Sequence, residues 1–204
     1  MTNSIWLVRH APTERTGRAW TGWRSDPPLS AEGRRVAVNL AANLARRVPS
    51  GTAVVSSPAD RAVATAEGIA ARVGGRVEVD RDLQEVDVGD ADGLSFDELA
   101  AAHPALAARL LAAAAVVDWP GGERSADFRR RAAAAWRRIV EREDDAAVIV
   151  VTHGGVIGPL LALALPSDAA ADRERWLAAG GAISVERRDG AWWLGDRLAP
   201  GTGE

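Results

Sequence analysis

The chain contains no cysteine among its 204 residues. Disulfide bonds, thiolate nucleophiles and cysteine-ligated metal sites are therefore excluded. Lysine is missing as well, because all 25 basic residues are arginine. Each functional cation must then be a planar guanidinium with a permanent charge.

An excess of positive charge and long hydrophobic runs are also absent. The formal net charge of −3 and the isoelectric point near 5.7 give no electrostatic signature of binding to nucleic acid or to an anionic membrane. The longest apolar stretches, 110–117 and 156–165, are too short to cross a bilayer and are typical of core helices. The first residues lack the basic and long apolar parts of a signal peptide. We expect a cytoplasmic protein without a nucleic-acid or membrane partner.

Composition and length predict a single domain over residues 1–204. Hydrophobic residues make up 47% and charged residues 26% of the chain, values typical of a globular protein with a sizeable core. Strand-like segments alternate with helix-like segments, the pattern of an α/β domain built around a largely parallel sheet. We expect three layers, with helices on both faces of the sheet.

The expected elements have recognisable boundaries. Asp189-Gly190 is a hairpin-turn signal, so the strands that flank it should be antiparallel and lie at the sheet edge. His103-Pro104 should break the helical insertion expected at about 95–125, because the residue before a proline avoids the helical region. We expect strands at 4–9, 52–56, 76–79, 147–152, 182–187 and 191–197, and further helices at 30–47, 57–73 and 125–141.

Two of the three histidines each follow a short apolar strand. Arg9 and His10 end the first strand, and His153 follows the strand at 147–152. Ligands of α/β proteins gather beyond the carboxyl ends of strands, so these residues are candidates to face one pocket. Arg61, in the helix after the second strand, extends the cluster. Arginine forks match phosphate oxygens, and a neutral imidazole attacks phosphorus to give a phosphohistidine.

Five segments, in order along the chain, resemble the signature segments of one known family. The first, Leu7-Val8-Arg9-His10-Ala11-Pro12-Thr13-Glu14, is similar to the R-H-G signature of the histidine phosphatase superfamily, in its phosphoglycerate mutase-like branch. The others are 26–33 (D-x-P-L-S-x-x-G), 56–62 (S-S-P-x-x-R-A), 84–93 (with Glu85, Gly89 and Gly93) and 151–155 (V-T-H-G-G). The resemblance spans about residues 5–156 and implies a three-layer α/β/α sandwich.

The resemblance implies a role for each clustered residue. His10 is the expected nucleophile that becomes phosphorylated, and Arg9, Arg61 and His153 are expected to bind the phosphoryl oxygens. Glu85 is the expected general acid that protonates the leaving oxygen and then activates water. No metal ion or other cofactor is expected.

Four further residues are candidates to bind the substrate. Thr16 stands where the family often has asparagine, so it offers one donor instead of an amide. Gly154 stands where the acid-phosphatase branch has aspartate, and its backbone N–H at a helix start would add a donor to an anion. Trp23 is a candidate to stack on the organic group, with packing of the loop as the alternative. Arg124 is a candidate contact for a substrate anion, with a helix-start turn as the alternative.

We therefore expect a metal-independent phosphomonoester hydrolase that acts on small phosphorylated metabolites. The segments look most like those of α-ribazole phosphate phosphatases, although the motifs determine the reaction and not the leaving group. A cofactor-dependent phosphoglycerate mutase is the rival enzyme, and a phospho-ligand-binding module without turnover is the rival of another class. The sequence leaves the oligomeric state open, a homodimer included.

Overall fold

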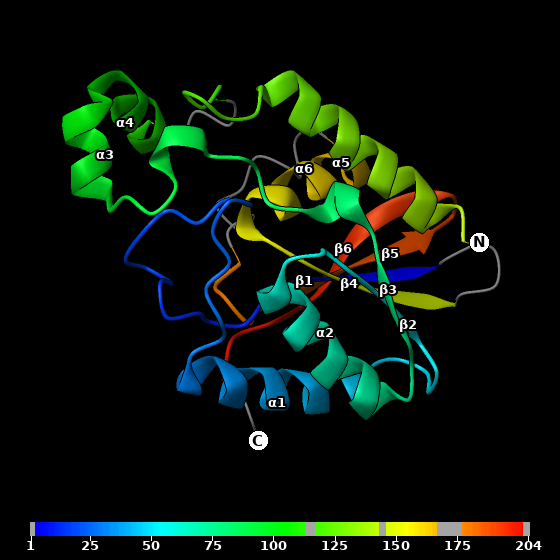
Figure 1. The fold of residues 1–204 in the computed structure, drawn as a ribbon. Coiled ribbons are helices and arrows are strands. Elements are labelled where there is room, and N and C mark those ends of the chain that lie inside the picture. Colours follow the sequence, from blue (N-terminus) through cyan, green and yellow to red (C-terminus); the bar gives the residue numbers. More distant parts are fainter. Residues whose placement is uncertain (1–2, 113–116, 143–145, 167–176, 202–204) are drawn as a thin grey trace.

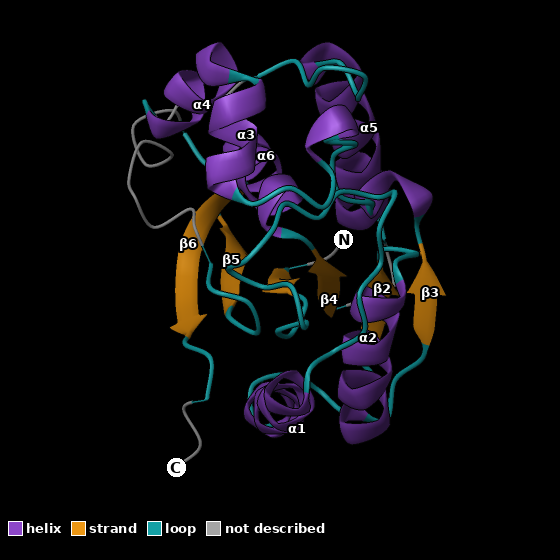
Figure 2. Ribbon diagram, turned by 60° about the vertical axis from the view of Figure 1, so that its left-hand side comes forward, coloured by secondary structure: helices purple, strands orange, loops and turns teal. Residues whose placement is uncertain are grey.

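A six-stranded sheet forms the centre of the computed structural model, which describes residues 3–112, 117–142, 146–166 and 177–201. Its strands follow the spatial order β3-β2-β4-β1-β5-β6 (Figures 1 and 2). They are β1 (Ser4–Arg9), β2 (Ala53–Ser56), β3 (Val77–Val79), β4 (Ala147–Thr152), β5 (Ala182–Arg188) and β6 (Ala191–Leu198). The first four are parallel to one another, whereas β5 pairs antiparallel with β1 and β6 pairs antiparallel with β5. The expected mostly parallel sheet with an antiparallel edge hairpin is confirmed.

The hairpin turn has the backbone conformation that its two residues favour. Asp189 has φ 51° and Gly190 has φ 81°. Two successive positive φ angles are characteristic of the tight turn that matches the twist of antiparallel strands, and aspartate and glycine adopt them readily. The turn therefore directs the last strand back along β5.

Two hydrophobic cores cover the two faces of the sheet. Alternate residues of a strand point to opposite faces, and β1 follows this rule: Ile5 and Leu7 belong to one core, and Trp6 and Val8 belong to the other. The first core packs against α5 (Ser125–Val140) and α6 (Gly154–Ala164), and the second against α1 (Ala31–Ala45) and α2 (Asp60–Val73). The two helix pairs lie on opposite sides of the sheet (Figure 1). The three-layer sandwich is thus confirmed.

Two short helices stand to one side of the three layers (Figure 1). They are α3 (Phe96–Ala102) and α4 (Pro104–Leu111), and they meet at His103, where the backbone leaves the helical region at φ −136° and ψ 66°. A capping box between Ser95 and Glu98 begins the first of them. A third hydrophobic cluster, which includes Leu99 and Trp119, packs them onto the chain around the 3₁₀ turn η2 (Gly89–Ala91). Another 3₁₀ turn, η1 (Arg81–Leu83), precedes it in the chain, and its Leu83 belongs to the first core. The expected helical break is present, while 113–116 of the expected insertion lie outside the described residues.

The helix expected from residue 57 begins later, at Asp60. Ser57 stays outside the helix because it is buried and its hydroxyl accepts hydrogen bonds from His153 and from the backbone of Ala59. The carboxylate of Asp26 then accepts from the N–H groups of Asp60 and Arg61 at the helix start. A distant side chain therefore caps this helix.

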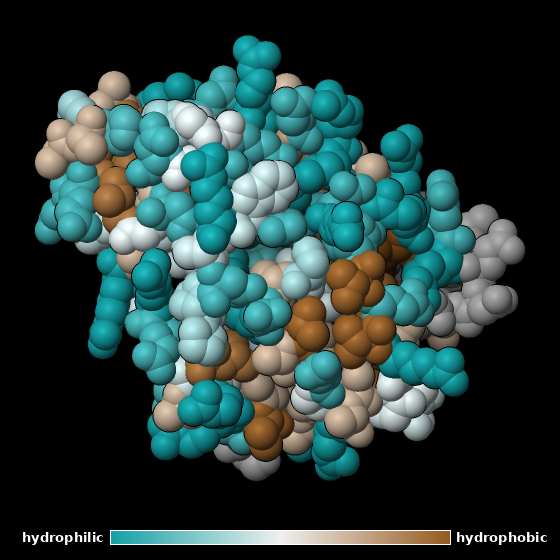
Figure 3. Space-filling model, in the orientation of Figure 1, coloured by the Kyte–Doolittle hydropathy of each residue, from teal (hydrophilic) through white to brown (hydrophobic). Residues whose placement is uncertain are grey.

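The face of the molecule in Figure 3 is largely hydrophilic, with hydrophobic residues in small patches. Scattered exposed apolar side chains are normal for a folded domain. Within the described ranges, no helix combines the length and apolar character needed to span a membrane.

Candidate active site

The site lies at the carboxyl ends of three adjacent parallel strands. His10 follows β1, His153 follows β4 and Ser57 follows β2, and the pairing of Arg9 with Thr152 brings the first two ends level. The imidazole centroids of the two histidines are 5.1 Å apart, with the rings inclined at 64°. The sheet register thus brings together two histidines that are far apart in the sequence.

His10 is held as a neutral ring with one defined lone pair. Its Nδ1 lies 2.9 Å from the carbonyl oxygen of Ala11, which only accepts, so Nδ1 carries the proton. Burial, together with the positive charges of Arg61 and Arg9, lowers the pKa of His10 to about 3. The ring is therefore neutral at physiological pH, and its lone pair lies on Nε2.

His153 is completely buried and has the opposite tautomer. A terminal guanidinium nitrogen of Arg61 lies 3.2 Å from Nδ1, and a guanidinium only donates, so Nδ1 accepts. The proton then resides on Nε2, which donates to the hydroxyl oxygen of Ser57 at 2.7 Å. Burial, followed by the effects of His10 and Arg61, holds the pKa of His153 well below its usual value.

Arg61 is a buried cation, only 2% exposed, and its terminal nitrogens are saturated. Nη1 donates to Ser25 O at 3.1 Å and to the Asp26 carboxylate at 2.9 Å. Nη2 donates to Gly22 O at 3.0 Å and to His153 Nδ1 at 3.2 Å. Within the described part of the chain, the fifth donor, Nε–H, has no hydrogen-bond partner. Arg61 therefore ties the loop that follows His10 to His153.

Arg9 has an orphaned donor. Its Nη1 donates to Leu177 O at 2.9 Å, but its buried Nε has no partner among the residues that the structure describes. Burial lowers the pKa of Arg9, while the charge of Glu85 opposes this shift. Gly154 makes room for the guanidinium, because a Cβ added there would lie 3.3 Å from Arg9 Cζ. A buried N–H without an acceptor is costly, and an anion at this place would supply one.

Glu85 lies close enough to Arg9 and Arg61 for their charges to act on its carboxylate. Its two carboxylate oxygens accept from the N–H groups of Gly155, at 3.2 Å, and Val86, at 3.0 Å. Desolvation raises the pKa of Glu85, and these hydrogen bonds and the charges of Arg61 and Arg9 only partly offset it. A Cβ at position 155 would overlap the carboxylate, so glycine there lets Glu85 keep this position. The arrangement combines a neutral imidazole, two guanidinium groups and a carboxyl group that retains its proton to higher pH than usual.

The family follows from a comparison with known proteins. The model of the histidine phosphatase superfamily (branch 1) matches residues 5–197. The chain belongs to this superfamily.

Relatives of the superfamily cover the chain to different extents. "Bifunctional protein Rv2228c" of Mycobacterium tuberculosis is 40% identical over 121 residues, which are 59% of this chain and 33% of that protein. The chain thus spans about a third of the length of several curated relatives that it matches.

Solved structures of the superfamily match nearly the whole fold. The mycobacterial glucosyl-3-phosphoglycerate phosphatase Rv2419c, in a complex with VO3, has a TM-score of 0.79 and 27% identity and covers 95% of this chain and 98% of its own. The α-ribazole phosphatase of Shigella flexneri has a TM-score of 0.77 and covers 98% of this chain and 100% of its own; at 22% identity this is a likeness of fold. Both neighbours, phosphatases in name, thus share the architecture, and the α-ribazole phosphatase is of the type that the sequence resemblance pointed to.

The remaining substrate-binding candidates lie in loops and at a helix start. Thr16 is exposed, and its hydroxyl accepts from Thr13 N at 2.9 Å within the loop turn. Trp23 is 40% exposed, and its side chain donates to the carboxylate of Asp87. Arg124 is exposed at the N-cap of α5. Among the described residues, none of these three side chains forms a hydrogen bond to the histidines, to Glu85 or to the two clustered arginines.

Two further tryptophans pack against aromatic partners. Trp20 packs against Trp119, with ring centroids 5.4 Å apart, and Trp192 packs against Trp136 at 5.6 Å.

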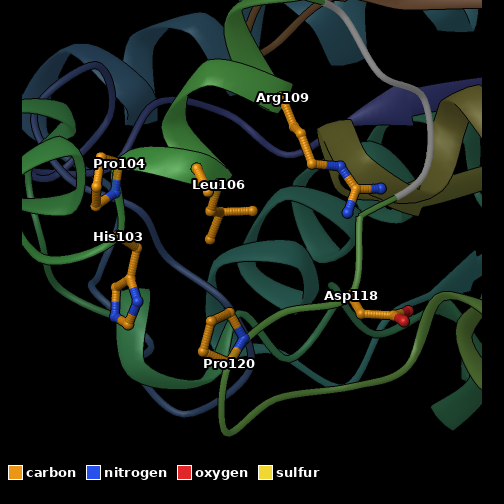
Figure 4. Close-up of a pocket in the computed structure, with 7 residues that line it drawn as sticks. His103, Pro104, Leu106, Arg109, Asp118 and Pro120 are labelled. Atoms are coloured by element: carbon orange, nitrogen blue, oxygen red, sulfur yellow. The ribbon is translucent and has the colours of Figure 1, made fainter.

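The third histidine of the chain lies elsewhere. His103 borders a cavity of about 310 Å³ between α4 and the segment 118–120 (Figure 4). The cavity is lined by His103, Pro104, Ala105, Leu106, Arg109, Asp118 and Pro120. None of these residues belongs to the histidine-arginine cluster. In the described ranges, no group of three or more histidine, cysteine, aspartate or glutamate residues is arranged to hold a metal ion.

Sequence reasoning did not single out three residues that hold the site together. Asp26 and Ser57 lie inside two of the matched segments, so their motif positions could have drawn attention to them. Arg131, one of several arginines in α5, carries no such signal. Helical periodicity does not show which of these arginines contacts backbone carbonyl groups.

Proposed function

We propose that this chain is a metal-independent phosphomonoester hydrolase that acts through a phosphohistidine at His10. The state of His10 carries the proposal: the ring is neutral, its Nδ1–H is bound to Ala11 O, and its Nε2 lone pair is free to attack. The charges of Arg9 and Arg61 act on this ring, and two guanidinium groups match the two negative charges of a phosphomonoester. The function stays a proposal for the whole protein, since the chain covers only part of some relatives.

In the first half-reaction, Nε2 of His10 forms a bond to phosphorus as the bond from phosphorus to the leaving oxygen breaks. Glu85, whose pKa is raised by burial, gives its proton to that oxygen. The unpartnered Nε–H of Arg9 and the Nε–H of Arg61 bind phosphoryl oxygens and stabilise their charge. The alcohol leaves, and the phosphoryl group stays on His10.

In the second half-reaction, the Glu85 carboxylate takes a proton from water while the water oxygen attacks phosphorus. The bond between Nε2 and phosphorus breaks, so inorganic phosphate leaves and His10 returns to its neutral state. His153 would donate its Nε2–H to a phosphoryl oxygen; in this structure the hydroxyl of Ser57 accepts that hydrogen bond. Gly154 would donate its backbone N–H from the start of α6. No other group has to change its protonation.

The substrate class that fits this machinery is a small phosphorylated metabolite. We propose Thr16, Trp23 and Arg124 as contacts of its organic part, since they lie outside the cluster that binds the phosphoryl group. α-Ribazole phosphate is the first candidate because the sequence resembles phosphatases of that type. Glucosyl-3-phosphoglycerate is the second, on the name of the mycobacterial neighbour.

The test is phosphate release by the wild type and His10→Ala, with α-ribazole phosphate, glucosyl-3-phosphoglycerate, sugar phosphates, 3-phosphoglycerate and p-nitrophenyl phosphate. An alkaline quench during turnover, followed by peptide mass spectrometry, locates the phosphoryl group. We expect it on His10, together with loss of turnover in His10→Ala. His103→Gln, which removes the histidine outside the cluster, is the matched control and should keep both. Turnover that survives in His10→Ala would contradict the proposal.

A further inference from the structure

The backbone around Glu85 has no helix or strand to hold it. Residues 84–88 lie between the two 3₁₀ turns η1 and η2 and have no regular structure. A general acid must nevertheless stay within hydrogen-bond reach of the leaving oxygen, and a displacement of about 1 Å can cost a factor of about 100 in rate. Some other contact must therefore fix this segment.

One side chain, that of Arg131 on α5, holds the segment through three carbonyl groups. Its Nη1 donates to Asp82 O at 2.9 Å and to Gln84 O at 2.6 Å, and its Nη2 donates to Glu85 O at 3.0 Å. The two remaining donors, on Nε and Nη2, bind the two oxygens of Glu123, each at 2.8 Å. All five donors of the guanidinium are thus used, which only arginine provides.

The surroundings keep this guanidinium in place. The side chains of Arg131 and Glu123 are 13% and 9% exposed, so the ion pair is largely desolvated. The guanidinium carbon lies 4.8 Å from the ring centroid of Phe128 and 5.6 Å from that of Trp23. The N–H of Glu123 also donates to Asp87 O at 2.9 Å, which holds the far end of the segment.

Both ends of Glu85 are therefore bound to helices of the same sheet face. Arg131 of α5 holds its carbonyl group, and Gly155 of α6 holds its carboxylate. The hydroxyl of Thr152, next to His153, donates to the neighbouring carbonyl of Leu83 at 2.7 Å. The acid thus has a fixed place relative to the phosphoryl site.

We infer that Arg131, supported by Glu123, is a positioning residue for the general acid Glu85. The inference rests on the proposed function, because it assumes that Glu85 protonates the leaving group. It predicts a defect that depends on the leaving group. Phenyl phosphate needs a proton on its departing oxygen far more than p-nitrophenyl phosphate does, so loss of positioning slows the first substrate selectively.

The experiment measures kcat/KM for these two substrates with wild type, Arg131→Met, Arg131→Lys and Glu85→Gln. We expect Arg131→Met to lower kcat/KM for phenyl phosphate at least about tenfold more than for p-nitrophenyl phosphate. Arg131→Lys, which keeps the charge but not the five donors, should show a smaller selective loss. In the double variant with Glu85→Gln, the selective loss should equal that of Glu85→Gln alone, because both changes remove the same step.

Arg138→Met is the matched control. It removes a half-exposed arginine from the same helix whose partners are the carboxylates of Asp80 and Asp82 rather than the carbonyls of the acid segment. We expect Arg138→Met to keep the wild-type ratio of kcat/KM for the two substrates. Glu123→Gln keeps Arg131 and weakens only the ion pair that supports it. It should lower kcat/KM for phenyl phosphate more than for p-nitrophenyl phosphate, as Arg131→Met does. This variant replaces Arg131→Met in the test if Arg131→Met does not fold.

Four results separate the possible failures. An equal loss for both substrates in Arg131→Met, with a selective loss in Glu85→Gln, would overturn the positioning role alone. A further selective loss in the double variant would overturn it too, since the two residues would then act independently. No selective loss in Glu85→Gln would remove Glu85 as the acid and the inference with it, whereas activity in His10→Ala would refute the proposed function itself.

Discussion

Nδ1 of His153 lies 3.2 Å from a guanidinium nitrogen of Arg61, and because a guanidinium only donates, the imidazole must accept there. A proton added to that nitrogen would face another donor inside the core. The ring of His153 is completely buried, so water cannot replace the lost acceptor. The folded site therefore accommodates neutral histidines, and protonation of the buried ring requires the fold to open.

Stability should fall as the pH drops below about 6.5. An unfolded histidine has a pKa of about 6.5, whereas the folded pKa of His10 is about 3. Between these values the unfolded chain binds a proton that the folded chain does not, so the free energy of unfolding falls as the pH falls. From pH 7.5 to 5.5 the loss from His10 is about 1.4 kcal/mol. Above pH 7.5 this group contributes no further change.

Urea unfolding of wild type and His10→Gln at the two pH values measures this term. The variant should lose about 1.4 kcal/mol less than the wild type on acidification. His103→Gln, outside the cluster, serves as the control for the loss of a histidine. Parallel losses in wild type and His10→Gln would mean that His10 titrates alike in the folded and unfolded states.

The alkaline limb of the pH-rate profile should belong to Glu85. Its pKa is raised by desolvation, so its proton is lost above the usual range, and kcat/KM falls as the pH rises through that pKa. Because the pKa of His10 is about 3, the nucleophile stays neutral well below pH 6.5 and sets no acid limb there. Profiles of kcat/KM with phenyl phosphate from pH 4 to 9 should show the alkaline limb in the wild type and lose it in Glu85→Gln. An unchanged limb in the variant would point to another acid.

Gly155→Ala should damage the acid rather than the fold. An added Cβ would overlap the Glu85 carboxylate, which then has to leave the N–H of residue 155. We expect kcat/KM to fall by a factor of about 100, since a shift of about 1 Å has this effect on a reacting group. Gly68→Ala in α2 is the control, because a Cβ there meets no atom within 4 Å. It should leave activity unchanged and stabilise the protein by about 0.5–1 kcal/mol. Equal activity of both variants would contradict the close packing of Glu85.

The strands, and the reactive side chains at their ends, are predictable from the sequence. The contacts that hold those side chains in place are not. β1 and β4 are short apolar runs that end on Arg9-His10 and on His153, so their place in a parallel sheet brings the histidines together. Asp26 reaches the start of α2 from a loop 34 residues earlier in the chain, and no local pattern encodes that distance. The contacts of Arg131 are equally hard to predict, because its partners are backbone carbonyl groups, which every residue has.

The 3₁₀ turns η1 and η2 show where pattern reasoning is weakest, since elements of three residues carry no periodicity.

Arg61→Lys should show that geometry, and not charge alone, makes the site. Lysine keeps the positive charge but has three donors on one nitrogen, so it cannot serve Gly22 O, Ser25 O, Asp26 and His153 together. Each buried acceptor left without a partner costs about 1–3 kcal/mol. We therefore expect a loss of about 2–4 kcal/mol in the free energy of unfolding and a fall in kcat/KM of more than about 100-fold.

Arg34→Lys is the control for this substitution, because Arg34 is exposed and its guanidinium binds one carbonyl, Leu29 O, at 2.7 Å. Its stability should change by less than about 0.5 kcal/mol. The nitrogen chemical shifts of His153 add a readout that a general loss of stability would not move: with Arg61 gone, Nδ1 loses its donor, and the ring is free to exchange tautomers. Wild-type stability, wild-type activity and a single His153 tautomer in Arg61→Lys would contradict this prediction. The four hydrogen bonds of Arg61 would then not be the contacts that hold the loop after His10 against His153.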